Sequence, residues 1–174
     1  MDLYRTVIEV IDARSFSNLW YWLVLGGAWS AATHYVLGVP WDMVARARRH
    51  GGRDEDDLHE VLRVHVLRTV ALGERGGIWL LALGSFVLTA LALLGFAYGV
   101  EFAQAAFLLL APLCGVWLMR LRVARHLAAG GAPGAALYVR LGRHRRAVQA
   151  VGAAAIFVTA LFGMYQNLAL GAFR

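Results

Sequence analysis

The apolar stretches of this chain contain few side chains that could do chemistry, and His34 is the foremost of them. It is the only ionisable residue well inside an apolar segment, a position that in membrane proteins usually marks a functional site. A haem at His34 would need a second axial histidine. The later apolar segments contain none, so a bis-histidine haem protein requires His34 from two chains. Pro40 ends the segment about one and a half helical turns after His34. His34 therefore lies near the membrane interface, which favours a structural role for it.

The other histidines and the single cysteine do not indicate a metal site. His59 and His65 are six residues apart, whereas two ligands on one helix face are normally three or four apart. His126 and His144 lie among arginines, whose charge repels a cation. Cys114 is alone, which excludes an intramolecular disulfide and a thiolate cluster within one chain. We therefore expect neither a metal nor a cofactor.

Uncharged polar residues give a second candidate site. Ser85 and Thr89 share one face of a predicted helix, and with His34 they would form an intramembrane polar site. Together with Thr159, such a site would suit a homo-oligomeric channel or small transporter. No apolar segment carries the strings of acids or arginines that proton relays and voltage sensors use, so interhelical hydrogen bonding is favoured. No nucleophile–base set, phosphate-binding loop or paired carboxylate motif is present, and we predict that the protein is not an enzyme.

The distribution of arginines along the chain predicts which segments form the helices that carry these residues. All 17 basic residues are Arg, and 14 of them lie in the segments 40–77 and 120–147. The chain is 60% hydrophobic with a mean hydropathy of +0.58, and about 20 apolar residues are enough to cross a bilayer as a helix. The sequence predicts an all-α integral membrane four-helix bundle in one membrane domain, 1–174, with spans at 19–39, 78–98, 102–119 and 148–170.

Three further helices are expected outside the spans. Residues 1–14 are amphipathic and predict an interfacial helix. A second amphipathic helix is expected within 54–72, with breaks at Gly73, Gly76 and Gly77 before the second span. A short basic helix is expected over 137–146, leading into the last span. Between the second and third spans we expect no helix but a tight turn at 98–101.

The same arginines predict the orientation. The two segments 40–77 and 120–147 fall on one side of a four-span protein, and only Arg5, Arg14 and Arg174 lie elsewhere. Cationic loops are retained in the cytoplasm, so we expect a multi-pass protein of the bacterial inner membrane with both termini in the periplasm. The acidic start lacks the basic region of a signal peptide, and we expect the first span to be retained. Topology accounts for the excess of Arg, and nucleic acid is not an expected partner.

Small residues at helical spacing predict where helices pack. In the first span, Gly26 and Ser30, and Gly27 and Ala31, are pairs four residues apart that allow close approach. The last span has a face of small residues that would serve either the bundle or an external partner. Its members are Gly152, Ala155, Thr159 and Gly163.

Four stretches of the chain carry a family resemblance. They are RSFSNLWYW, THYVLGVPWD with the arginines that follow it, GFAYGVEFAQA and IFVTALFGMYQN. With them the chain resembles a family of uncharacterised alphaproteobacterial four-span membrane proteins, some labelled "component of SufBCD complex", the iron–sulfur cluster assembly machinery. The resemblance implies a partner on the cytoplasmic side. Because Cys114 is the only cysteine, that link would be docking rather than cluster ligation.

These observations favour a non-enzymatic accessory, anchoring or assembly subunit of a larger membrane-associated complex. The expected partners are membrane lipids and other protein subunits, or further copies of the chain. Segment 120–147 has seven arginines and no acid, so we expect it to bind anionic lipid or a partner. Its arginines are Arg120, Arg122, Arg125, Arg140, Arg143, Arg145 and Arg146.

Overall fold

The computed structural model describes residue 16, residues 18–131 and residues 134–171 of the 174. The interfacial helix predicted over 1–14 lies outside the described residues. The predicted all-α fold is confirmed. In chain order the elements are α2 (Leu19–His34), β1 (Tyr35–Val36), β2 (Val39–Pro40), α3 (Trp41–His50), α4 (Arg53–Arg75), α5 (Gly77–Ala92), the π-helical turn η2 (Leu93–Ala97), α6 (Glu101–Ala128) and α7 (Ala135–Gly171).

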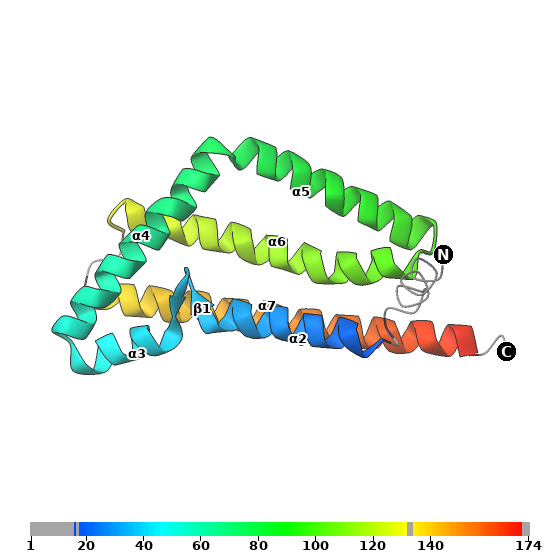
Figure 1. The fold of residues 1–174 in the computed structure, drawn as a ribbon, viewed down its shortest axis with the longest axis horizontal. Coiled ribbons are helices and arrows are strands. Elements are labelled where there is room, and N and C mark those ends of the chain that lie inside the picture. The colour runs from blue at the N-terminus through cyan, green and yellow to red at the C-terminus, as the bar shows by residue number, and fades with distance from the viewer. Residues whose placement is uncertain (1–15, 17, 132–133, 172–174) are drawn as a thin grey trace, which may run out of the picture.

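Four long helices run alternately in opposite directions (Figure 1). α6 packs against both α5 and α7, and α2 packs along α7. The start of α2 and the end of α7 lie at the same end of the molecule as the turn between η2 and α6 (Figure 1). The β1–β2 hairpin, α3 and α4 lie at the other end, beside the last turns of α6 and the first turns of α7. We call this end the base; it consists of residues 35–75, 120–128 and 135–147. Both Arg-rich segments therefore meet there.

Within the described residues, three helices are long and apolar enough to cross a membrane: Gly77–Ala97, Glu101–Ala128 and Ala135–Leu168. The first predicted span, 19–39, differs from the observed element. α2 ends at His34 after 16 residues, which is about 24 Å, shorter than the roughly 30 Å of a hydrocarbon core. The prediction that the helix continues to residue 39 is wrong.

The hairpin explains where α2 stops. Val36 pairs with Val39, and the two residues between them have positive φ, 54° at Leu37 and 90° at Gly38. This is the turn geometry that matches the twist of two antiparallel strands. Leu37 tolerates its conformation because its side chain is almost fully buried, at 1% exposure. Pro40 then precedes the first turn of α3.

Two helices are longer than predicted. The basic segment 137–146 is not a separate helix but the first part of the 37-residue α7. Gly142 is the only glycine or proline between Ala135 and Val151, and a single glycine costs a helix only about 1 kcal/mol. α4 likewise continues through Gly73 to Arg75. A Cβ at Gly73 would lie 2.6 Å from Leu121 Cδ1, so this glycine serves the close approach of α4 to α6.

The base has a hydrophobic core of its own. One face of α4 contributes Leu58, Leu62 and Val66, at the helical spacing predicted for an amphipathic helix. The remaining buried members come from the hairpin, α3, α6 and α7: Val36, Leu37, Val39, Val44, Ala47, Ala124, Leu137 and Leu141. Each large aliphatic side chain buried in this way contributes roughly 1.5–3 kcal/mol. The Arg-rich segments are therefore parts of a packed unit rather than loose loops.

Hydrogen bonds between helices close the opposite end. Gln104 Nε2 donates to the Gly95 carbonyl at 2.8 Å, and Gln104 Oε1 accepts from Gln166 Nε2 at 2.6 Å. These bonds join η2, α6 and α7. A Cβ on Gly95 would lie 2.9 Å from the backbone nitrogen of Gln104, so glycine is needed where η2 meets α6.

Candidate functional site

A cavity of about 390 Å³ lies where the hairpin meets α2, α6 and α7. Its wall is apolar on the side of the spans and polar towards the base. The lining residues are Ala31, Ala32, Tyr35, Gly38, Leu113, Val116, Trp117, Arg120, His144 and Val148. They come from four elements, so the cavity exists only because these elements pack together.

Two basic side chains form the polar part of the cavity. Arg120 is the first charged residue after the apolar stretch 102–119 of α6, and His144 stands one turn before Val148 in α7. The histidine is 7% exposed. The Arg120 side chain is half-buried, and its Nε is buried without a hydrogen-bond partner. The cavity wall contains no Asp or Glu among its described residues, so nothing in it balances the guanidinium charge.

The hairpin turn brings a third basic group close to the cavity. A Cβ built on Gly38 would lie 2.5 Å from His65 Nδ1 and 3.0 Å from Arg120 Nη2. Gly38 is therefore the contact point between the hairpin, α4 and α6. Its positive φ and the two crowding side chains both exclude a larger residue.

The seven arginines of segment 120–147 divide into two groups. Arg122, Arg125, Arg143 and Arg146 are exposed, whereas Arg120, Arg140 and Arg145 are half-buried. Of the inner group, Arg145 lies 4.5 Å above the Trp41 ring, and its Nε donates to the Thr33 carbonyl at 3.5 Å. Arg145 thus connects α7 with the end of α2 and the start of α3.

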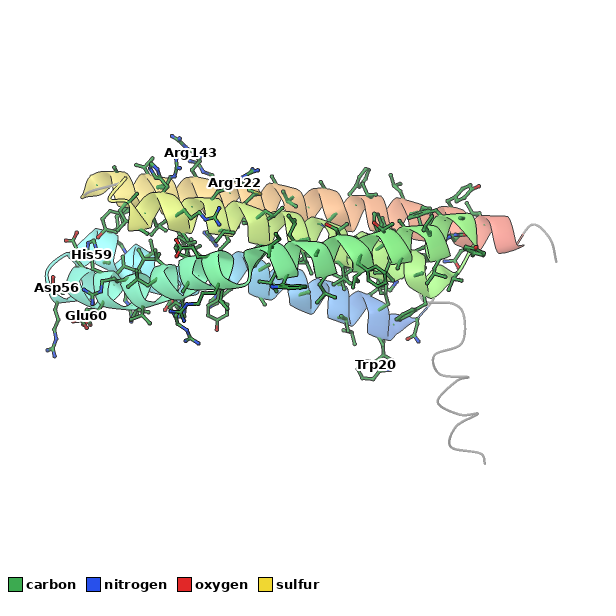
Figure 2. All side chains as sticks on the ribbon, turned by 90° about the horizontal axis from the view of Figure 1, so that it is seen from above. Trp20, Asp56, His59, Glu60, Arg122 and Arg143 are labelled. Carbon is green, nitrogen blue, oxygen red and sulfur yellow. The ribbon has the colours of Figure 1, made fainter. Side chains whose placement is uncertain are left out.

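The outer group forms a basic surface. Figure 2 shows Arg143 pointing away from the molecule at the edge where α7 lies, with Arg122 on the same side, whereas Asp56 and Glu60 of α4 lie towards the opposite edge. We define the basic face as Arg122, Arg143 and Arg146. Arg125 is left out because it reaches α4, where its Nη2 would lie 3.4 Å from a Cβ built on Gly73.

Ion pairs do not neutralise the basic face. The two ion pairs among the described residues both use histidine: His50 Nδ1 lies 3.1 Å from Asp54 Oδ2, and His59 Nε2 lies 3.8 Å from Glu55 Oε1. No arginine in residues 18–131 and 134–171 has a carboxylate within 4.0 Å. The basic face is therefore free to bind anions from outside the chain.

The structure does not assemble the predicted intramembrane polar site. His34 is exposed at the end of α2, with its ring edge-to-face against Tyr35 at 4.9 Å. Ser85 and Thr89 are exposed on α5. Within one chain these three residues do not meet, because α2 packs on α7 whereas α5 packs on α6. Their assembly between copies of the chain stays a prediction.

The small-residue pairs of the first span do not pack within this chain. Gly26, Gly27, Ser30 and Ala31 are all exposed, and a Cβ on either glycine would meet nothing within 4 Å. The expectation of close packing on this side of α2 is therefore wrong for the chain alone. The opposite side of α2 packs on α7 through a large residue, Trp29.

The small face of α7 lies inside the bundle. Gly152, Thr159 and Gly163 are buried and Ala155 is half-buried. A Cβ on Gly152 would lie 2.7 Å from Trp29 Cε3, and one on Gly163 would lie 3.3 Å from Phe16 Cβ. Aromatic side chains therefore fill the hollow that the small residues leave.

No group of three or more metal-ligating side chains occurs in the part of the chain that the structure describes. The cavity was missed from sequence because Arg120 and His144 are 24 positions apart. The available signal was that Arg120 is the charged residue closest to the apolar part of α6, that His144 stands one turn before Val148 in α7, and that α6 and α7 are neighbours. No protein-family model, curated protein or solved structure matches this chain.

Proposed function

We propose that the protein is a non-enzymatic accessory or anchoring subunit of a larger complex in the bacterial inner membrane. In this proposal the four long helices cross the bilayer, the base lies in the cytoplasm, and the basic face binds a partner. One observation carries it: the base is a packed unit with its own core that presents arginines without carboxylate partners. Only a folded surface can hold such charges at fixed positions.

Exposed aromatic residues support a membrane crossing by α2. Trp20 stands at its start, pointing away from the bundle (Figure 2), and is 69% exposed. Tyr35 follows its last residue and is 51% exposed. Tryptophan and tyrosine favour the two interfaces of a bilayer. α2 is short, and the hairpin after it would then lie at the level of the headgroups, where local thinning of the bilayer accommodates a short span.

The chemistry of the basic face indicates an anionic partner. Guanidinium groups bind carboxylates and phosphates through pairs of hydrogen bonds. An acidic protein surface at the cytoplasmic side of the membrane would meet Arg122, Arg143 and Arg146 together. The resemblance noted above makes the iron–sulfur assembly machinery a first partner to test.

The test is to neutralise the basic face and measure partner retention. The triple variant Arg122→Gln, Arg143→Gln, Arg146→Gln should lose co-purifying proteins that wild type keeps at low salt. Wild type should lose the same proteins at high salt, because exposed charge interactions are screened within about 10 Å at 0.1 M salt.

A matched control removes the same charge elsewhere. Helix α4, which also carries acidic residues, has three exposed arginines: Arg53, Arg63 and Arg68. The variant with Gln at these three positions should retain the partners. Equal retention by both triple variants, with both inserted in the membrane, would contradict docking through the basic face. Within one chain His34, Ser85 and Thr89 lie apart, so the rival homo-oligomeric channel would have to bring them together between copies of the chain.

A further inference from the structure

The cavity beneath the hairpin stands at the border between apolar and charged parts of the molecule. Leu113, Val116 and Val148 line the side towards the spans, while Arg120 and His144 line the side towards the base. Trp117 and Tyr35 complete the wall, and both are residue types that favour the membrane interface. In a bilayer this level is where acyl chains meet headgroups.

The charge of the cavity is not balanced from within. An arginine stays protonated in proteins, so Arg120 carries its positive charge into a half-buried position. Its buried Nε makes no hydrogen bond, and a buried donor without a partner costs roughly 1–3 kcal/mol. A ligand with acceptor oxygens in the cavity would meet the guanidinium at its terminal nitrogens and balance its positive charge. A phosphate group suits it, because its oxygens match the planar array of guanidinium donors.

We propose that this cavity binds the phosphate of one anionic glycerophospholipid. Arg120 holds the phosphate, His144 lines the same polar end, and an acyl chain lies against Leu113, Val116 and Val148. Basic pockets between transmembrane helices on the cytoplasmic side are suited to anionic headgroups. A choline headgroup would place a second cation beside Arg120 and is disfavoured. The apolar wall favours a lipid over a free phosphate ion. The inference rests on membrane insertion but not on docking at the basic face.

The experiment titrates the full chain, purified in a mild non-ionic detergent and delipidated, with three probes. These are phosphatidylglycerol, phosphatidylcholine with the same acyl chains, and inorganic phosphate. The readouts are the midpoint of thermal unfolding and the number of lipids retained in native mass spectrometry. Wild type should be stabilised by phosphatidylglycerol and should retain one molecule tightly. Phosphatidylcholine and inorganic phosphate should give much smaller shifts.

Two variants locate the site. Arg120→Gln should need about tenfold more phosphatidylglycerol for the same shift, the size expected when one charge-assisted contact is lost. Ala31→Leu adds apolar bulk on the cavity wall and leaves the charges in place, so it should also weaken retention. If Arg120→Gln does not fold, the Ala31→Leu variant tests the site on its own. Arg68→Gln, which removes an exposed arginine on α4, should behave as wild type.

The outcomes separate the alternatives. Unchanged phosphatidylglycerol binding in the folded Arg120→Gln variant, or in Ala31→Leu, would overturn the site. Equal weakening in Arg68→Gln would show attraction by net charge alone. An equal shift with inorganic phosphate would make the ligand a free phosphate, and an equal shift with phosphatidylcholine would remove the preference for negative charge. The triple variant of the basic face should keep its tight lipid, so failure of partner docking leaves this result unaffected.

Discussion

At Gly152 the Trp29 ring lies so close to the α7 backbone that a methyl group has no room. The distance from a built Cβ to Trp29 Cε3 is 2.7 Å, and both residues are buried. The contact holds α2 on α7. It therefore fixes the position of the hairpin, whose strand β1 follows α2 directly. A single residue thus influences the cavity, whose nearest lining residue on α7, Val148, is about one helical turn away.

We predict that Gly152→Leu lowers the free energy of unfolding by about 1–3 kcal/mol, because overpacking forces the Trp29 ring or the helix backbone to move. Thermal unfolding in detergent measures the effect. Gly26→Leu is the matched control: it places the same side chain on α2 where no atom lies within 4 Å, and it should leave stability nearly unchanged. A larger loss from Gly26→Leu than from Gly152→Leu would contradict this packing of α2.

Among the elements, α4 shows most clearly how an amphipathic pattern becomes a surface. Its buried residues include Leu58, Leu62 and Val66, while Val64 and Leu67 remain 53% exposed. One face packs on the base core, and the other remains available to water, headgroups or a partner. The pattern predicts the helix and its buried face, but the elements that cover that face depend on the tertiary packing.

Leu62→Ala should destabilise the base by about 2–5 kcal/mol, because it removes buried methyl groups and leaves a cavity. Leu67→Ala, made on the exposed face, should change stability by about 0.5 kcal/mol or less. Hydrogen exchange measures the difference locally. Leu62→Ala should speed exchange in α3 and α4 while the apolar parts of α5, α6 and α7 stay protected. Equal effects of the two substitutions would refute the assignment of the buried face.

At the scale of the whole molecule, the fold brings residues 40–77 and 120–147 to one end of the bundle (Figure 1). The two segments carry 14 of the 17 arginines. A distribution of this kind holds one end of a membrane protein in the cytoplasm, and acidic residues contribute little to the effect.

Reporter fusions test the resulting topology. A fusion after Arg53 and one after Gly131 should report the cytoplasm, and a fusion after Arg174 should report the periplasm, if all four long helices cross the membrane. These three sites report on α5, α6 and α7, so α2, the shortest of the four helices, is tested separately with an accessible tag at the N-terminus. Periplasmic accessibility of the tag would mean that α2 crosses, and cytoplasmic accessibility with unchanged fusion signals would mean that the three longer helices alone span. A periplasmic signal after Arg53 or after Gly131 would contradict the orientation.

The sequence by itself determined the helical class, most of the helix positions and the gathering of charge at one end. These properties depend on local composition: long apolar runs must form helices where water is absent, and arginine blocks separate them. The amphipathic helix over 54–72 and the turn at 98–101 follow from spacing and glycine positions within a few residues. The observed α4 and the break between η2 and α6 agree with both.

Only the tertiary structure decided which residues meet. Arg120 and His144 are 24 positions apart, and this separation gives no sign that they line one cavity. Whether they do depends on the angular position of each residue on its helix and on how far α6 and α7 are shifted along each other. The same reason explains the exposed Gly26 and Gly27: small residues allow close approach, but a neighbour must face them. The hairpin at 35–40 was hidden because Val36 and Leu37 fit an apolar helix as well as a turn, and burial against the base core selected the turn.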